Sequence, residues 1–226
     1  RTDLNAYRQR EKNPMTMIFS LSARFGAFLL CASQLAAVPA FADHPGENLN
    51  QVMAAKEASF EPITPRDAPE LVWQGASGDL VSLSTLKGKV VVLSFLPNGC
   101  GSPCEAQQEK LGQTISALNS SAMREMVVFV TLSDDPQTDP REQNWMSAQG
   151  PDAESLVDAS IALAAPSDRP STSPQVHLLN RKSQQVGIFH GAAFEPLNLL
   201  LYINGLTNAH PHEEPSILQR VIGWFS

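Results

Sequence analysis

Cysteine is scarce in this sequence: its 226 residues include only Cys31, Cys100 and Cys104. A zinc site built from two separate cysteine pairs would lack half of its ligands. The methionines that follow residue 42 are scattered and form no Met-x-x-Met cluster, so no methionine-rich copper site is indicated. No phosphate-binding loop, no Ser/His/Asp set, no internal repeat and no low-complexity tract stands out. The chemistry is therefore expected to centre on the cysteines.

Long apolar runs are also missing. The run at residues 25–38 is interrupted by polar side chains and is too short to cross a membrane comfortably. Arg24 precedes it and the small-x-small sequence Ala40-Phe41-Ala42 follows it, a pattern typical of a secretory signal peptide. We expect cleavage after Ala42, which would remove Cys31. The polar residues 1–14 are interpreted as leader or vector-derived sequence.

Basic residues are outnumbered, and the net charge is −7. Residues 1–42 are net positive, so the exported part would be more acidic still. An acidic surface argues against nucleic acid and anionic membranes as partners, and fits a cationic metal or a basic protein patch. Export also implies an oxidising compartment, in which two cysteines pair unless they are kept reduced.

The expected organisation is one domain with flanking segments, because residues 43–226 are enough for a single hydrophobic core. The predicted parts are leader sequence at 1–14, a signal peptide at 15–42, an extended N-terminal segment at 43–70, a folded domain at 71–208 and a C-terminal tail at 209–226.

The folded domain is predicted to be an α/β structure. Its patterns indicate, in order, a hairpin, a strand, a helix, a strand, a helix, a second hairpin and a helix. The segments are 71–89, 90–96, 103–118, 126–132, 151–165, 174–190 and 195–208, with a short helix expected within 49–60. This alternation predicts a central mixed sheet flanked by helices. The order resembles the thioredoxin-like fold with an extra N-terminal β-hairpin.

Cys100 and Cys104 lie between the strand at 90–96 and the following helix. A helix N-terminus favours the thiolate, which is both a redox nucleophile and a soft-metal ligand. Three uses are open from the residues alone: a redox pair, a copper site or an inert structural disulfide. The acidic loop at 133–143 follows a second buried strand and is expected at the same sheet edge as the cysteine loop.

These motifs resemble the Sco/SenC family of copper-binding cytochrome oxidase assembly factors. The resemblance is carried by "LSTLKGKVVVLSFLPNGCGSPCEAQQEKL" and "VVFVTLSDDPQTDP", and more weakly by "HPGE" and "FHGAAFEPLNLLLYINGLTN". It implies a thioredoxin-like fold, copper as the metal, Cys100 and Cys104 as ligands, and an Asp-Pro-x-x-Asp loop formed by Asp135, Pro136 and Asp139.

Three positions depart from that family's pattern or favour a reductase. Thr172 stands where the family has its third copper ligand, a histidine, and threonine is a poor Cu(I) ligand. Gly101 follows the first cysteine where the family favours proline. Pro174 stands where periplasmic thioredoxin-like reductases carry a cis-proline. These positions favour thiol–disulfide chemistry, and a decayed copper site is a further alternative.

Two histidines are candidate replacements for the missing ligand. His177 lies within the predicted strand at 174–180, and a packed or edge-facing strand histidine is the favoured interpretation. His190 ends the next strand, where a structural hydrogen bond is as plausible as a metal bond.

The sequence thus predicts an exported, periplasmic Sco-like protein, with membrane association left open. Cys100 and Cys104 would bind copper, exchange thiols, or both, during assembly of the oxidase copper site. As an enzyme it would be a thiol–disulfide oxidoreductase, with Cys100 attacking and Cys104 resolving. The expected partner is the copper-bearing subunit of cytochrome oxidase or another periplasmic thiol protein, with no nucleic acid and no stable small-molecule substrate. The alternatives are a periplasmic oxidoreductase without copper and a degenerate binding module with a structural disulfide.

Overall fold

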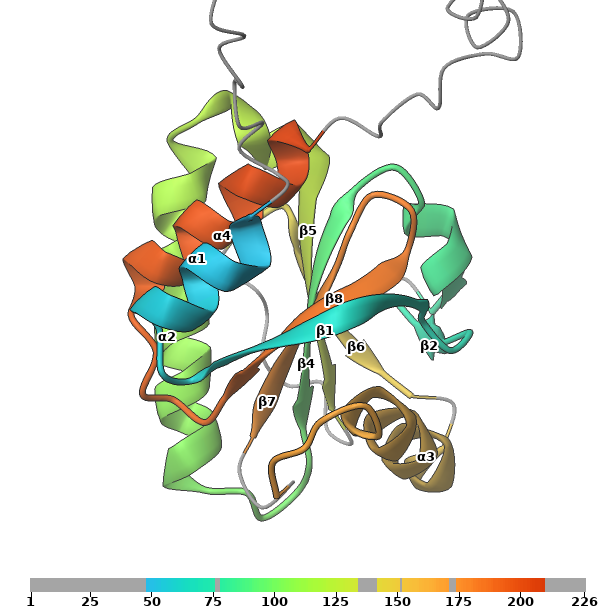
Figure 1. Ribbon diagram of the computed structural model, residues 1–226. Coiled ribbons are helices and arrows are strands. Elements are labelled where there is room, and N and C mark those ends of the chain that lie inside the picture. The colour runs from blue at the N-terminus through green and yellow to red at the C-terminus, as the bar shows by residue number, and fades with distance from the viewer. Residues whose placement is uncertain (1–47, 76–77, 134–141, 151, 171–173, 210–226) are drawn as a thin grey trace, which may run out of the picture. The chain divides into compact units, whose positions relative to one another are not determined.

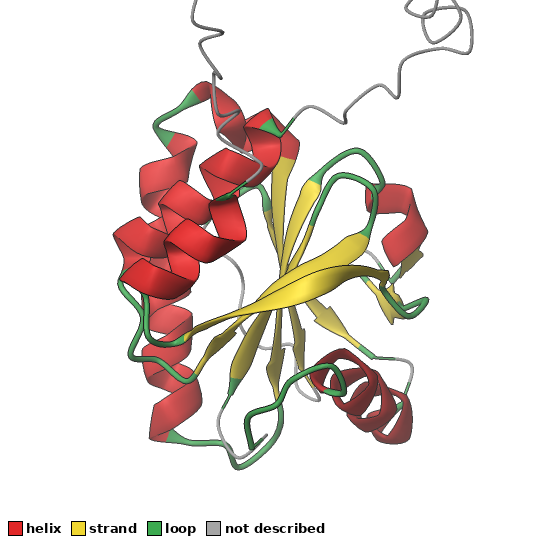
Figure 2. Ribbon diagram, viewed as in Figure 1, coloured by secondary structure: helices red, strands yellow, loops and turns green. Residues whose placement is uncertain are grey.

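The computed structural model describes residues 48–75, 78–133, 142–150, 152–170 and 174–209. All of them belong to one compact unit, Asp43–Ser226. Within these ranges the chain forms one eight-stranded mixed sheet and four α-helices (Figures 1 and 2). None of the described helices is both long enough and apolar enough to cross a lipid bilayer.

The sheet has the strand order β1-β8-β7-β4-β5-β6-β2-β3. Its strands are β1 (Phe60–Asp67), β2 (Val72–Gln74), β3 (Leu80–Ser82), β4 (Val90–Leu96), β5 (Val127–Ser133), β6 (Trp145–Gln149), β7 (Gln175–Leu179) and β8 (Gln184–His190). The helical segments are α1 (Leu49–Lys56), α2 (Ser102–Asn119), α3 (Ala153–Ala164) and α4 (Pro196–Asn208), with the short 3₁₀ turns η1 (Leu83–Leu86) and η2 (Ala122–Met126).

Helices cover both faces of the sheet. Figure 1 shows α1, α2 and α4 grouped on one side and α3 on the other. Alternate residues of β4 enter the two cores: Val90 and Val92 pack with α2 and α4, whereas Val91 and Leu93 pack with α3. The continuous apolar run of this strand is explained by burial on both faces, as its sequence predicted.

The centre of the sheet brings two loops to one edge. Strands β4 and β5 are parallel, and Leu96 pairs with Ser133 at their carboxyl ends. The start of the cysteine loop and Ser133, the last described residue before the acidic loop, therefore lie at the same edge, as expected for an α/β sheet. Strand β7 runs antiparallel to β4, which places its first residues beside the start of the cysteine loop.

Two strands were not expected from the sequence. Residues 60–67 were interpreted as part of an extended segment because of Pro62 and Pro65, yet they form β1 and pair with β8. Proline is tolerated there because β1 is the edge strand, and the pairing register shifts between Pro62 and Arg66. Strand β6 was also missed. It pairs in parallel with β5, and its sequence, "WMSAQ", has no β-branched residue.

The other elements agree with the sequence patterns within a few residues. The first hairpin exists and lies at the far edge of the sheet, where Trp73 pairs with Val81. Asp152 caps α3 as expected, since its carboxylate accepts a hydrogen bond from the N–H of Ser155 at 2.7 Å. The short helix α1 ends at Lys56 rather than near residue 60, because β1 already begins at Phe60.

Candidate functional site

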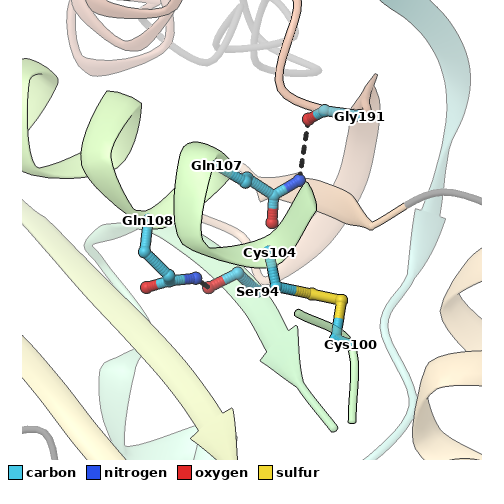
Figure 3. The surroundings of a disulfide bond; sticks show 6 residues. All are labelled: Ser94, Cys100, Cys104, Gln107, Gln108 and Gly191. Carbon is cyan, nitrogen blue, oxygen red and sulfur yellow. Dashed lines mark hydrogen bonds between the residues drawn. A yellow bond between two sulfur atoms is a disulfide. The ribbon is translucent and has the colours of Figure 1, made fainter. Parts of the chain in front are cut away.

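Cys100 and Cys104 form a disulfide at the start of α2, with their Cα atoms 5.8 Å apart (Figure 3). Cys104 lies in the first turn of the helix and is only 1% exposed. Cys100 lies in the turn before the helix and is partly exposed. The two cysteines are therefore unequally exposed: Cys100 is accessible to another molecule, whereas Cys104 is buried.

Two glycines allow this turn to form. Gly99 and Gly101 both have positive φ values, 78° and 65°, a region that other residues rarely adopt. Gly101 is also the residue that precedes the first turn of α2. Proline cannot take its place in this geometry, because its ring fixes φ near about −65°. The departure from a Cys-Pro sequence thus has a structural cause.

A pocket of about 440 Å³ opens beside the disulfide. Both cysteines line it, together with Pro174 and His177 from the segment that enters and forms β7. Residues of α3 form part of its wall, among them Ile161, which is 61% exposed. The structure therefore brings together four of the five predicted site residues: Cys100, Cys104, Pro174 and His177.

Pro174 belongs to the lining of this pocket. Its carbonyl oxygen accepts a hydrogen bond from the N–H of Gly191 at 2.7 Å. The peptide bond before it joins Ser173, which lies outside the described residues, so the expected cis geometry stays a prediction.

His177 is 1% exposed, and its ring packs edge-on against that of Phe95, with the ring centroids 5.9 Å apart. The side-chain nitrogen of Gln185 donates to the carbonyl oxygen of Leu163 at 2.8 Å, and the same nitrogen lies 3.2 Å from Nδ1 of His177. Because that nitrogen is a donor, Nδ1 accepts, and the ring proton lies on Nε2. Burial, with a smaller contribution from His190, lowers the pKa of His177 to about 3. The imidazole is therefore neutral at physiological pH.

His190 is not among the residues that line the pocket. Its Nε2 lies 2.6 Å from a carboxylate oxygen of Glu61, and its Nδ1 lies 3.4 Å from the amide nitrogen of Gln175. Both ring nitrogens thus have protein partners, which is the structural role that the sequence left open.

Glu61 also anchors the segment that leads toward Pro174. Its carboxylate accepts hydrogen bonds from the hydroxyl of Ser167 at 2.6 Å and the N–H of Asp168 at 2.9 Å. Burial alone would raise the pKa of Glu61, but the donors Ser167, Asp168 and His190 together lower it. The carboxylate is therefore the favoured form, and it holds the segment that follows α3 to strand β1.

Polar residues on α2 were missed by the sequence analysis. Gln107 is fully buried, and its amide nitrogen donates to the carbonyl oxygen of Gly191 at 2.9 Å (Figure 3). Gln108 donates to the hydroxyl of Ser94 at 3.3 Å and accepts from that of Thr131 at 3.2 Å. Gln107 and Gln108 follow Cys104 by three and four residues, so they lie near it on one face of the helix. This spacing is the sequence feature that could have identified them as neighbours of the disulfide.

Several predicted positions lie outside the described residues: Thr172 and the three residues of the Asp-Pro loop, Asp135, Pro136 and Asp139. Among the residues that are described, no group of three or more His, Cys, Asp or Glu side chains is arranged to hold a metal ion. Two soft sulfur donors fit Cu(I) chemically, but the described part of the chain supplies no third ligand in place.

No protein-family profile and no curated protein matches this sequence. Solved structures of the Sco family do resemble its fold. BsSco, described as having a disulfide switch and as a member of the Sco family of cytochrome c oxidase assembly proteins, gives a TM-score of 0.53 at 15% identity, over 66% of this chain and 97% of that one.

Two further Sco structures show the same likeness. Yeast Sco1 with copper bound gives a TM-score of 0.52 at 15% identity, over 67% of this chain and 98% of that one. A SCO1/SenC family lipoprotein from Bacillus anthracis str. Ames gives a TM-score of 0.51 at 17% identity, over 65% of this chain and 97% of that one. At these identities the likeness establishes the fold, and the predicted thioredoxin-like architecture is confirmed.

Proposed function

We propose that this chain is an exported Sco-like protein in which Cys100 and Cys104 form a reversible thiol–disulfide pair. The observation that carries the proposal is the asymmetry of the pair. Cys100 is partly exposed at a pocket, whereas Cys104 is buried in the first turn of α2. An inert structural disulfide has no need of an exposed sulfur beside a pocket.

The exchange reaction follows from this asymmetry. The thiolate of reduced Cys100 attacks one sulfur of a partner disulfide, the partner S–S bond breaks, and one partner thiolate leaves. The Cys104 thiolate then attacks the Cys100 sulfur and releases the second partner thiolate. Two electrons pass to the partner, which gains two thiols, and Cys100–Cys104 becomes the disulfide. The helix N-terminus favours the thiolates that both steps need.

The proposed partner is a copper-binding protein whose ligands are cysteines, specifically the copper-bearing subunit of cytochrome oxidase; another periplasmic thiol protein is the alternative. The motifs around Cys100, Cys104 and Asp135 support this, as does the fold shared with BsSco and yeast Sco1. Reducing the partner's cysteines would make them available to copper, since the thiolate is the metal ligand.

Copper transfer is a second candidate function. It is supported by the copper bound to yeast Sco1 and by the two soft sulfur donors of this site. Here copper would be cargo held by the reduced pair, with a further ligand from the partner or from a rearranged His177.

A trapping experiment tests the exchange function. All arms use a Cys31→Ser background, so that the pair supplies the only thiols. Cys104→Ser is expected to form a mixed disulfide with oxidised glutathione at least about tenfold faster than Cys100→Ser, because the buried position is less accessible. Equal rates, or no reaction of either variant, would contradict the proposed roles.

A copper titration separates the two candidate functions. The reduced protein competes for Cu(I) with a chromophoric chelator, and Thr172→His is measured in parallel. Weak binding that rises in Thr172→His supports exchange as the main function. Tight one-to-one binding that is lost in Cys100→Ser supports copper transfer instead.

A further inference from the structure

Gln107 lies one helical turn after Cys104 and is fully buried. Its amide nitrogen donates to the carbonyl oxygen of Gly191 at 2.9 Å. Because a carbonyl oxygen can only accept, the nitrogen must face Gly191 and the amide oxygen must face away from it. The orientation of this side chain is therefore fixed by a backbone atom.

The amide oxygen of Gln107 has no hydrogen-bond partner in the described part of the chain, although it is buried. Figure 3 shows it directed to the side of the amide on which Cys104 lies, away from Gly191. A helical side chain covers the turn that precedes its own Cα, and residues three apart share one helix face. Cys104 lies on that face, three residues before Gln107, and its side chain becomes a donor when it is reduced.

We propose that this oxygen accepts the S–H of reduced Cys104, so that Gln107 shifts the redox equilibrium of the pair toward the dithiol. In the disulfide the Cys104 sulfur carries no hydrogen, and a buried acceptor without a donor is unfavourable. Reduction supplies the donor. The bond to Gly191 is made in both states and cancels from the difference. The inference rests on the proposed function, because it concerns a pair that cycles.

The same side chain connects the two halves of the site. Gly191 accepts from Gln107 through its carbonyl oxygen and donates through its N–H to the carbonyl oxygen of Pro174. Gln107 is thus a positioning residue between the helix that carries Cys104 and the segment that carries Pro174.

The first test is a redox titration of the full chain in the Cys31→Ser background. Protein disulfide and two glutathione thiols are equilibrated with protein dithiol and glutathione disulfide. In Gln107→Leu we expect the equilibrium constant for disulfide formation to rise about five- to tenfold. Both states lose the bond to Gly191, and only the reduced state also loses the bond from Cys104. A tenfold rise corresponds to a reduction potential lower by about 30 mV.

Gln113→Leu is the matched control, since Gln113 is exposed on the same helix and its amide nitrogen donates to Glu109 at 3.4 Å. Its equilibrium constant is expected to stay within about twofold of the parent. An equally small change in Gln107→Leu would overturn the inference. If that variant does not fold, Gln107→Met carries the same test, because a thioether is only a weak acceptor.

Infrared spectroscopy gives a second readout that does not depend on exchange. With Cys100→Ser and Cys31→Ser, Cys104 is the only thiol, and its S–H stretching band reports its hydrogen bond. Adding Gln107→Leu is expected to shift that band to higher frequency; an unchanged band refutes the inference. If the parent protein never equilibrates with glutathione but Gln107→Leu still shifts the Cys104 band, the proposed function is refuted, whereas the hydrogen bond from Cys104 to Gln107 stands.

Discussion

Glu57 provides the sharpest test of how this fold is held together. It follows α1, and the residue is only 7% exposed. One oxygen accepts from the N–H and the hydroxyl of Ser59, at 3.3 and 2.7 Å. The other accepts from the N–H of Glu195 at 3.0 Å and the amide nitrogen of Asn198 at 2.9 Å. The carboxylate therefore joins the α1–β1 turn to the start of α4.

The expected loss in Glu57→Gln follows from these contacts. Glutamine keeps one acceptor oxygen, so two of the four hydrogen bonds survive, and its amide group meets the remaining donors. A hydrogen bond to a charged group contributes roughly 1.5–3 kcal/mol. The negative charge near the N-terminus of α4 adds about 0.5 kcal/mol. At the low end of that range, two lost bonds and the lost charge lower the free energy of unfolding at neutral pH by about 3.5 kcal/mol.

The loss must also depend on pH. Burial alone would raise the pKa of Glu57, but the donors Asn198, Glu195 and Ser59 together lower it. A carboxyl whose folded pKa lies below its unfolded value stabilises the fold above the unfolded pKa, about 4.3 for glutamate, and this stability is lost as pH falls through the folded pKa. The difference between parent and Glu57→Gln should therefore shrink below about pH 4.

Urea unfolding followed by circular dichroism at a series of pH values measures this difference. Other titrating groups, Glu61 among them, are common to both proteins and cancel from it. Glu195→Gln makes the same chemical change on an exposed side chain and is expected to alter stability by less than about 0.5 kcal/mol. A loss in Glu57→Gln below about 1 kcal/mol, or one that stays constant with pH, would refute this account.

Three further predictions concern His177 and two glycines. His177, whose pKa burial lowers to about 3, should show no imidazole titration by NMR between about pH 5 and 8; a midpoint near its usual value of about 6.5 would contradict its burial. Gly187→Ala should lower stability by about 1–3 kcal/mol, because a Cβ there would lie 2.5 Å from the ring of Phe60. Gly112→Ala, inside α2 and with only an ordinary 3.7 Å contact to Trp145, should instead raise stability by up to about 1 kcal/mol in the same unfolding assay. Equal effects of the two alanines would contradict the packing described.

The sequence predicted most of what is buried on both faces of the sheet. The run at 90–96 needed no tertiary information, because seven mostly β-branched and aliphatic residues before a Gly-Pro-rich turn leave few other structures. The helix that carries Cys104 was predicted from Pro103 and from the apolar spacing of Leu111, Ile115 and Leu118. These three apolar side chains are buried.

What the sequence could not predict depends on pairing between distant segments. Pro62 and Pro65 disfavour a strand in isolation, and β1 forms because β8 offers it an edge. The position of His177 required the register between β4 and β7, in which it pairs with Leu93. In that register the side chain of His177 lies on the α3 side of the sheet and lines the pocket. The distance between His177 and Thr172 along the chain did not predict this position.

The orientation of His177 bears directly on whether it can replace the histidine that Thr172 lacks. A neutral imidazole binds a metal through a nitrogen that carries no proton. In His177 that nitrogen is Nδ1, which already accepts from Gln185. Binding through Nε2 would move the proton to Nδ1, where it would face the amide N–H of Gln185, itself fixed by the carbonyl oxygen of Leu163. Copper ligation by His177 through either nitrogen therefore breaks at least one hydrogen bond of Gln185 in a buried site, whereas thiol exchange at Cys100 requires no change there. This difference is the structural reason to place thiol exchange ahead of copper transfer.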